Sequence, residues 1–301
     1  MQPPLPVVGG AAARAAPVVS TAVAATDDPA VLVGPLIETR LRVATWNLWW
    51  RFGNWEERLP LVIDELRAAD PDVVALQEVW HDGGTSSAHR IAEALGHEAT
   101  FGGTIELADG VRFGNAVVSR WPISSQEVLR LPDGGKADEH RLVVRADIDG
   151  PRGPLQVYAT HLNWRMDHSD VRQAQVRALA ELIARSRPRT YPPVVCGDFN
   201  AEPGSVEVQM LTGQREVPVD DVLLVDVWRA THPTEDGFTW SNDNPYAASQ
   251  LEWNRRIDYV FVGWPKAAGA GSPLSCRLLG TAPTGDVWPS DHYGLVAGLR
   301  Y

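Results

Sequence analysis

Short apolar runs alternate with helically spaced apolar positions from about residue 41 to the end of the chain. Apolar runs bounded by Gly, Pro, Asn or Asp are typical of buried strands, whereas apolar residues at every third or fourth position predict amphipathic helices. We therefore predict helices over residues 56–69, 87–95 and 171–186. The predicted strands cover residues 41–46, 72–77, 115–119, 142–148, 155–160 and 256–262, a central strand that begins at residue 194, and a last strand over 294–299.

Strand pairs mix with strand–helix–strand units along the chain, without strict alternation. This order predicts an α/β protein in which two mixed sheets pack face to face with helices outside. We expect this domain to cover residues 41–301. Residues 1–40, which are rich in Ala, Pro and Val, are predicted to form a flexible leader.

The leader makes an atypical signal peptide, because Arg14 is the only basic residue before Arg40 and prolines interrupt the apolar positions. We expect a cytoplasmic protein, with secretion as the alternative because Ala22-Val23-Ala24 resembles a cleavage site. No uninterrupted apolar stretch is long enough to span a bilayer, so we expect no stable membrane insertion.

Composition and net charge limit the classes of molecule that the chain is expected to bind. Its 301 residues are 44% hydrophobic and carry a net charge of -11. Such a protein repels a polyanion unless it has a local basic stripe, and the sequence has no Lys/Arg run of that kind. Cys196 and Cys276 fit no metal-ligand spacing, and we expect no disulfide framework. Five arginines in one helical stretch are predicted to face solvent: Arg172, Arg177, Arg185, Arg187 and Arg189.

The central strand ends abruptly in polar residues. Asp198 and Asn200 lie two positions apart, so their side chains would project to the same side of an extended chain. A carboxylate beside an amide suits a phosphate held next to a hard metal ion, although an Asx turn explains the same pair equally well. Because strand ends gather ligand sites in α/β folds, the recurrence of such residues favours the site. They recur at or near the other predicted strand ends as Asn47, Glu78, His161, Asp258, Asp291 and His292.

Six short motifs contain these residues in order: Thr45-Trp46-Asn47, Leu76-Gln77-Glu78-Val79, Thr160-His161-Leu162, Gly197-Asp198-Phe199-Asn200, Arg256-Ile257-Asp258-Tyr259 and Ser290-Asp291-His292. Together they resemble the ordered motifs of the endonuclease/exonuclease/phosphatase superfamily, the deoxyribonuclease I-like group. The resemblance runs from about Leu41 to Tyr301. It implies a four-layer α/β sandwich and a divalent-metal-dependent hydrolase of phosphate esters.

Such hydrolysis needs an activated water, relief of charge on the phosphoryl oxygens and help for the leaving oxygen. A carboxylate-held Mg²⁺ supplies the charge relief, with Mn²⁺ as the alternative ion. Glu78 is the predicted main metal ligand, as the resemblance also implies. We expect Asn47 to belong to the metal site and to orient a metal-bound water or the phosphate, and Asp291 to be a further metal contact.

His292 and Asp258 form a predicted pair in which the carboxylate fixes the imidazole tautomer and favours its protonated form. The resemblance implies that this pair lies at the scissile phosphate. His292 is predicted to act as base or as transition-state stabiliser, and Asp198 is the competing candidate for the base. Asn200 would bind a phosphate oxygen. His161 would donate to a phosphoryl oxygen or assist the leaving group.

Two loops are predicted to overhang the site, and they carry Trp164, Arg165 and Trp240. These residues would contact a base, sugar or head group, or serve only as lid packing. The sequence therefore predicts a monomeric, Mg²⁺-dependent phosphodiesterase of nuclease type that acts on nucleic acid, a nucleotide or a small phosphodiester. A phosphomonoesterase, a sphingomyelinase-like phospholipid hydrolase and a catalytically idle binding module are the alternatives.

Overall fold

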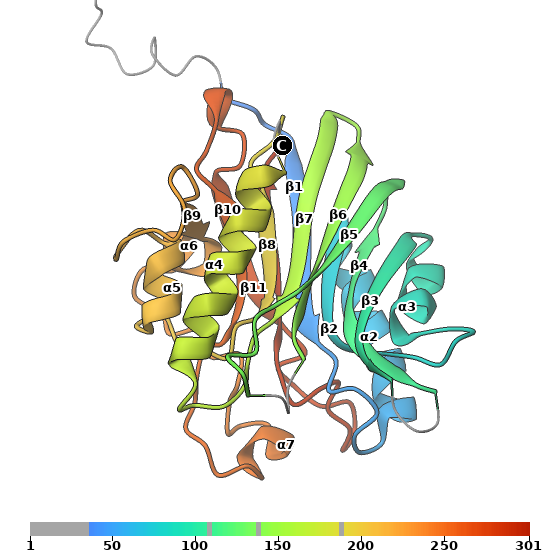
Figure 1. The fold of residues 1–301 in the computed structure, drawn as a ribbon. Helices are drawn as coiled ribbons and strands as arrows, with labels where there is room; N and C mark the ends of the chain where they lie inside the picture. Colours follow the sequence, from blue (N-terminus) through green and yellow to red (C-terminus); the bar gives the residue numbers. More distant parts are fainter. Residues whose placement is uncertain (1–35, 107–109, 137–139, 187–189) are drawn as a thin grey trace, which may run out of the picture.

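The computed structural model describes residues 36–106, 110–136, 140–186 and 190–301. The predicted leader therefore lies, up to residue 35, outside the described residues. Within the described part, the strands form two six-stranded sheets that lie face to face, with helices on the outer face of each (Figure 1). This is the predicted four-layer α/β sandwich.

The first sheet is mixed and has the strand order β11-β12-β1-β2-β4-β3. β1 pairs parallel with β2 and antiparallel with β12, which brings the last strand of the chain beside the first. The strands are β1 (Arg40–Asn47), β2 (Val73–His81), β3 (Glu98–Glu106), β4 (Arg112–Ser119), β11 (Pro273–Leu279) and β12 (Gly294–Arg300).

The second sheet is also mixed and has the strand order β5-β6-β7-β8-β10-β9. β8 pairs parallel with β7 and antiparallel with β10. Its contact with β7 is close, because a Cβ atom on Gly197 would lie 2.0 Å from the carbonyl oxygen of Thr160. The strands are β5 (Ile123–Arg130), β6 (Leu142–Gly150), β7 (Gly153–His161), β8 (Val194–Asp198), β9 (Leu224–Asp226) and β10 (Asp258–Gly263).

Among the described residues, four helices cover the sheets and three short helices lie in connections. The N-terminus of α3 is capped by the Ser86 side chain, which accepts the amide hydrogen of His89, and Gly96 ends the helix in a left-handed conformation. The covering helices are α2 (Trp55–Ala69), α3 (Ser87–Leu95), α4 (Ser169–Arg185) and α5 (Val206–Leu211). The short ones are α6 (Val227–Thr231), α7 (Pro245–Ala248) and the 3₁₀ helix η1 (Ala267–Gly269).

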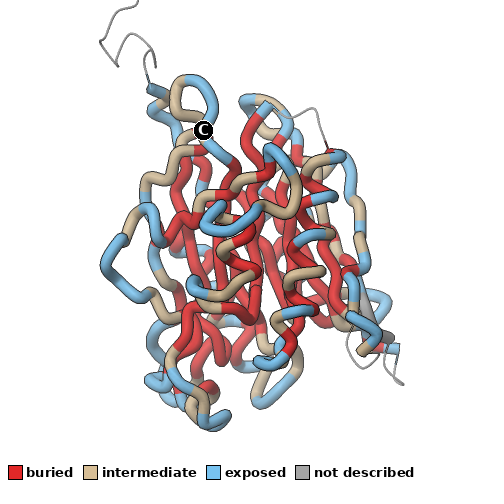
Figure 2. The backbone as a smooth tube through the Cα atoms, turned by 60° about the vertical axis from the view of Figure 1, so that its left-hand side comes forward, coloured by how far each residue is buried: buried red, intermediate tan, exposed pale blue. Residues whose placement is uncertain are grey.

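Three apolar layers hold the four structural layers together. The central layer lies between the sheets, where Val43 of β1 and Val157 of β7 belong to one buried cluster. A second cluster joins α4 and α5 to their sheet, and a third joins α2 and α3 to theirs. Figure 2 shows the result, a sandwich whose strands are buried over most of their length. Each large apolar side chain buried in this way stabilises the fold by about 1.5–3 kcal/mol. The strands are therefore held firmly, and so are the residues at their ends.

The structure confirms the eight predicted strands and adds β3, β5, β9 and β11. Cys196 and Cys276 are buried and free, as expected. One arginine prediction is wrong: Arg172 is buried, and its Nε lies 2.5 Å from Glu207 Oε1 on α5. Arg177 and Arg185 are exposed, whereas Arg187 and Arg189 lie outside the described residues. Among the helices described, none is long and apolar enough to cross a membrane.

Candidate active site

The predicted site residues meet at one end of the sandwich. β1 ends there at Asn47, β7 at His161 and β8 at Asp198, and the segment before β12 carries Asp291 and His292 to the same place. This end is the lower one in Figure 1, from which α7 projects. A cavity of about 560 Å³, called the cleft below, opens here. Eight of the predicted residues line it: Glu78, His161, Trp164, Asp198, Asn200, Trp240, Asp291 and His292.

Asp198 is the centre of this arrangement. Its Oδ1 accepts the backbone amide of Asn200 at 2.8 Å, which is the Asx turn considered above. Its Oδ2 accepts from Asn47 Nδ2 at 3.1 Å and lies 3.3 Å from His161 Nε2. The Asx turn is therefore present, and the same carboxylate contacts two other predicted site residues. Burial, together with the nearby charge of Asp258, raises the pKa of Asp198 to about 6.

Asn47 links two carboxylates of the cleft, Glu78 and Asp198. Its Nδ2 donates to Glu78 Oε1 at 3.2 Å and to Asp198 Oδ2 at 3.1 Å, so one amide group holds two carboxylates. Its Oδ1 accepts the backbone amide of Trp49 at 3.0 Å, which leaves one lone pair of this oxygen for another partner. The observed bonds therefore give Asn47 a role in holding the carboxylates.

The sequence suggested that Glu78 follows the end of a strand, but the structure places it within β2. β2 continues to His81, and its pairing with β4 shifts register between Leu76 and Val79. Glu78 lies in this irregularity with a φ of 52°, a left-handed conformation that is unfavourable for a residue with a side chain. Such irregularities re-aim side chains, and here Glu78 is directed into the cleft.

Glu78 and Asp291 are two cleft carboxylates with raised proton affinity. Burial raises the pKa of Asp291 to about 7, with a further contribution from the charge of Glu78. Burial also raises the pKa of Glu78, although His292 and the hydrogen bond from Asn47 lower it in part. Glu78 is half-buried and Asp291 is buried, and the charge of Glu78 acts on Asp291. Such a pair fits a hard divalent cation, which prefers oxygen ligands and would neutralise both carboxylates.

His292 and Asp258 form the predicted ion pair. His292 Nδ1 lies 2.9 Å from Asp258 Oδ2, and His292 Nε2 lies 3.8 Å from Asp198 Oδ2. Burial alone would lower the pKa of His292, but the charges of Asp258, Asp291 and Asp198 outweigh burial and raise it well above 6.5. His292 is therefore an imidazolium at neutral pH, and the edge of the Trp240 ring contacts it at 4.9 Å between centroids.

A second group of possible ligand atoms belongs to Asp198, Asp258 and His292, which all lie within 4.8 Å of one another. An imidazolium has no free lone pair for a metal ion. We therefore regard this group as a network of ion pairs, and the Glu78–Asp291 pair as the better fit for a cation.

His161 has the opposite charge state. Burial, followed by the positive charges of Arg141 and His292, lowers its pKa well below 6.5. The ring is neutral at physiological pH, so its contact with the Asp198 carboxylate makes Nε2 the protonated nitrogen. His161 thus offers a hydrogen bond and no readily transferable proton.

The three predicted contact residues lie in different surroundings. Trp240 is 7% exposed and packs on His292, whereas Trp164 is 54% exposed at the edge of the cleft. Arg165 is not among the residues that line the cleft. Its Nε lies 3.5 Å from Asp167, and its guanidinium lies over the ring of Trp164 at 5.8 Å.

The sequence did not single out Arg58, a buried residue in the first turns of α2. Its guanidinium donates to the carbonyl oxygens of Leu48 at 2.9 Å, Trp49 at 3.0 Å and Phe52 at 2.9 Å. It also donates to Pro289 at 3.1 Å, in the segment that carries Asp291 and His292. Burial lowers its pKa to about 10, against the opposing effect of Asp291. Arg58 therefore clamps one wall of the cleft to the residues before β12.

Other missed residues line the cleft directly. Arg141 is buried near Glu78 and His161, and its positive charge lowers the pKa of both. Arg255 is also buried, and its guanidinium pairs with Glu252. Neither arginine lies in one of the six motifs, so their sequence contains no signal for this position. Trp49, Phe52 and Phe113 add aromatic surface to the walls.

Comparison with known proteins identifies the family. A model of the endonuclease/exonuclease/phosphatase family matches residues 44–292, and the chain belongs to that family. A solved endonuclease/exonuclease/phosphatase from Beutenbergia cavernae is 25% identical, with a TM-score of 0.68 over 87% of this chain and 71% of that one. A Danio rerio TDP2 complexed with a single-strand DNA product has a TM-score of 0.71 and 20% identity, over 88% and 100% of the two chains.

Curated relatives match over shorter stretches. Human protein angel homolog 2 is 29% identical over 164 residues, which are 50% of this chain and 30% of that protein. The inositol phosphosphingolipids phospholipase C of Schizosaccharomyces pombe is 26% identical over 218 residues, which are 65% of this chain and 47% of that protein. The chain thus spans less than half the length of both relatives.

Proposed function

We propose that this protein is a divalent-metal-dependent phosphodiesterase, with Mg²⁺ as the metal. Membership of the family supports hydrolysis of phosphate esters. The observation that carries the proposal is the charge arrangement of the cleft. Glu78 and Asp291 repel one another on one side, while Asp198, Asp258 and His292 form an ion-pair network on the other.

Glu78 and Asp291 are the proposed metal ligands, because their raised pKa values show that no described residue fully compensates their charges. A bound Mg²⁺ would supply charge relief at the phosphoryl oxygens of the substrate. Asn47 holds Glu78 at a fixed position relative to Asp198, since it donates to both. The proposed metal ligand and the proposed base are thereby held in fixed relative positions.

Asp198 is the proposed base, and this choice follows from the charge states. His292 is already protonated at neutral pH, whereas the Asp198 carboxylate, with a pKa of about 6, accepts a proton from water. The oxygen of that water forms the new bond to phosphorus as the bond to the leaving oxygen breaks. His292 is the proposed acid that supplies the proton to the leaving oxygen, and Asp258 holds its ring in place.

Asn200 and His161 are proposed to contact the phosphate. Asn200 lines the cleft, and its φ of 49° is a left-handed conformation that asparagine adopts readily. Neutral His161 has a single N–H, which contacts Asp198 in this structure. We propose that it donates to a phosphoryl oxygen instead when substrate is bound, and that His161 does not serve as the acid. Trp164 and Trp240 are proposed to contact the group attached to the phosphate, while Arg165 acts through its stacking on Trp164.

Turnover of bis(p-nitrophenyl) phosphate tests this function. We expect hydrolysis with Mg²⁺ or Mn²⁺ and none with EDTA, and we expect Asp198→Asn and His292→Gln each to lower kcat by about 10²–10⁴-fold. Asp64→Asn, on the exposed surface of α2, is the matched control and should retain full activity. A wild-type protein that is folded and inactive with both metals would show a binding module instead of an enzyme.

A further inference from the structure

Large apolar side chains are exposed around the mouth of the cleft. The described residues expose eight large apolar side chains, and five of them lie on three loops that contribute residues to the cleft walls. These five, called the apolar rim below, are Phe52, Trp164, Met166, Leu251 and Trp253. The other three, Leu36, Val128 and Trp264, lie outside these loops.

The rim extends beyond the walls of the cleft. Phe52 and Trp164 line the cleft itself, so a substrate inside it would touch them. Met166, Leu251 and Trp253 do not line it, although Met166 lies two residues after Trp164. A substrate held wholly within the cleft would leave these three exposed. Their position fits contact with a surface on which the substrate lies.

Leu251 is the most unusual residue of the rim. It is 93% exposed and has a φ of 61°, and its two neighbours in sequence, Gln250 and Glu252, both line the cleft. A left-handed conformation costs a residue of this kind about 1–2 kcal/mol. Burial in the protein returns none of that energy, because the side chain is in water. A strained leucine directed to solvent beside a catalytic cleft indicates a contact made outside the protein.

The charges on the three loops of the apolar rim distinguish between nucleic acid and a lipid layer as the surface that the rim contacts. Arg51 pairs with Asp82, Arg165 with Asp167 and Arg255 with Glu252, so each of these loop arginines has an acidic neighbour. The whole chain carries a net charge of -11. Nucleic acid is bound through uncompensated positive charge and aromatic stacking, and Leu251 and Met166 supply neither. An apolar and locally neutral surface suits an electrically neutral lipid layer.

We propose that the apolar rim docks on a zwitterionic lipid surface, where a phosphodiester of a lipid head group enters the cleft. This inference rests on the proposed function and adds the class of substrate to it. Trp164 and Trp253 have the amphipathic rings that favour the membrane–water boundary, and Leu251 would reach into the apolar region below it. Hydrolysis adds water across one P–O bond and gives an alcohol and a phosphomonoester, with no other reactant.

Flotation with phosphatidylcholine vesicles tests the docking. We expect the wild-type protein to float with the vesicles and Leu251→Asn to partition about tenfold more weakly, because burial of a leucine side chain is lost. Asn adopts the left-handed conformation readily, so this variant should be at least as stable as the wild type. Trp264→Gln removes an exposed apolar ring remote from the cleft and is the matched control, which should float like the wild type.

Vesicle composition and a soluble substrate complete the test. Addition of phosphatidylglycerol should weaken flotation of the wild type, since the protein is acidic. Equal flotation of Leu251→Asn and wild type, or no flotation of the wild type, would overturn the docking. Leu251-dependent binding to a single-stranded oligonucleotide, without flotation, would assign the rim to nucleic acid instead. Turnover of bis(p-nitrophenyl) phosphate, measured in parallel, separates the two proposals: loss of flotation with intact turnover leaves the phosphodiesterase standing.

Discussion

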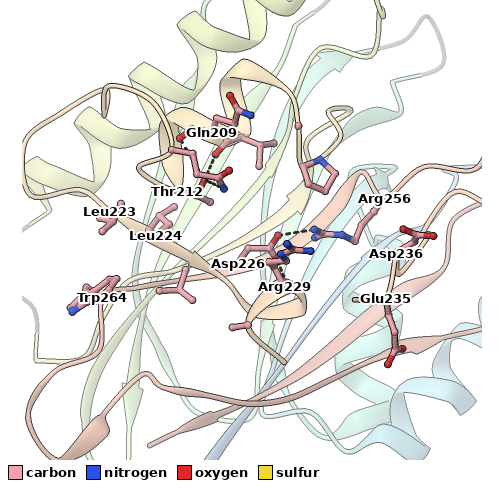
Figure 3. Close-up of a pocket in the computed structure, with 16 residues that line it drawn as sticks. Gln209, Thr212, Leu223, Leu224, Asp226, Arg229, Glu235, Asp236, Arg256 and Trp264 are labelled. Carbon is pink, nitrogen blue, oxygen red and sulfur yellow. Dashed lines mark hydrogen bonds and ion pairs between the residues drawn. The ribbon is translucent and has the colours of Figure 1, made fainter. Parts of the chain in front are cut away.

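Two cavities lined by described residues have similar volumes but differ in how their buried carboxylates are paired. The cleft has a volume of about 560 Å³, and a second cavity of about 600 Å³ lies beside β9 and α5 (Figure 3). In the second cavity, Arg256 Nη2 lies 2.8 Å from Asp226 Oδ2, and both side chains are nearly fully buried. In the cleft, by contrast, Asp198, Glu78 and Asp291 each have other carboxylates as neighbours.

The difference shows that volume does not identify the active site of this fold. The buried carboxylate of the second cavity is compensated by an arginine, which is what a structural ion pair requires. The carboxylates of the cleft are incompletely compensated, and their raised pKa values record that cost. This difference supports the proposal that the cleft binds a metal ion, whereas the Asp226–Arg256 pair has the contacts of a structural ion pair.

Matched substitutions in the two cavities should have opposite effects, and this is the largest difference we expect. Asp198→Asn should lower kcat by about 10²–10⁴-fold and leave the free energy of unfolding unchanged or higher, because a repelled charge is removed. Asp226→Asn should lower the free energy of unfolding by about 3–5 kcal/mol, since it leaves Arg256 buried without its counter-charge. Its kcat per folded molecule should be normal. Kinetics and urea unfolding of both variants measure this, and two variants with the same pattern would remove the distinction.

Arg58 should prove to be a positioning residue of the cleft. Arg58→Lys keeps the charge but cannot serve four separated carbonyl groups, so we expect about 3 kcal/mol of destabilisation and a kcat lower by about 10–100-fold. Arg67→Lys, at an exposed ion pair on the same helix, is the control. Steady-state kinetics, normalised to the folded fraction, distinguish a positioning role of Arg58 from a purely structural one. A stability loss with normal kcat would make Arg58 purely structural.

The free energy of unfolding of the metal-free protein should fall as pH rises. Asp198 and Asp291, with pKa values of about 6 and about 7, keep protons that the unfolded chain releases near 3.8. The free energy of unfolding should therefore fall as pH rises from about 4 to about 7, by about 1 kcal/mol or more. His292 continues the fall above pH 6.5, whereas the lowered pKa of His161 opposes it below that value.

Urea unfolding in EDTA at a series of pH values measures this dependence. Asp198→Asn should show a smaller fall than the wild type, because one of the raised carboxyl groups is gone. Asp226→Asn should show the same fall as the wild type. A free energy of unfolding that rises with pH across this range would contradict the charge assignment of the cleft.

The smallest effect is expected at the edge of the cleft. Trp240→Phe keeps the aromatic contact with His292 and removes an indole nitrogen that has no hydrogen-bond partner among the described residues. We expect the free energy of unfolding to change by less than about 1 kcal/mol and kcat by about threefold or less. Trp240→Ala should lower kcat clearly more. Steady-state kinetics of the two variants would show whether the ring itself is needed.

How far the fold follows from the sequence depends on the position of each strand. The eight predicted strands are the interior strands of the two sheets, and the four that were missed, β3, β5, β9 and β11, are their edges. Interior strands are covered on both faces and read as continuous apolar runs. β5 exposes several of its side chains, as in Ser124, Ser125 and Gln126, so its sequence lacks that run. β9 is only three residues long.

The residues of the site also fall into two groups, those that the sequence predicts and those that it does not. Residues in the six motifs, such as Asp198 and His292, could be predicted because they end or border interior strands. Arg58 could not, since its function lies in bonds to carbonyl groups that any sequence provides. Nor could the conformation of Glu78, because a register shift within β2 depends on the pairing with β4 and leaves no local signal.

The thermal unfolding temperature with and without Mg²⁺ tests the central claim most directly. The measurement belongs at about pH 8, where the carboxylates of the cleft are ionised and repel one another most strongly. We predict that Mg²⁺ raises Tm for the wild type and for Asp226→Asn, and that Glu78→Gln shows little or no rise. A wild-type Tm that Mg²⁺ leaves unchanged, or an equal rise in Glu78→Gln, would contradict the assignment of the cleft to a metal ion.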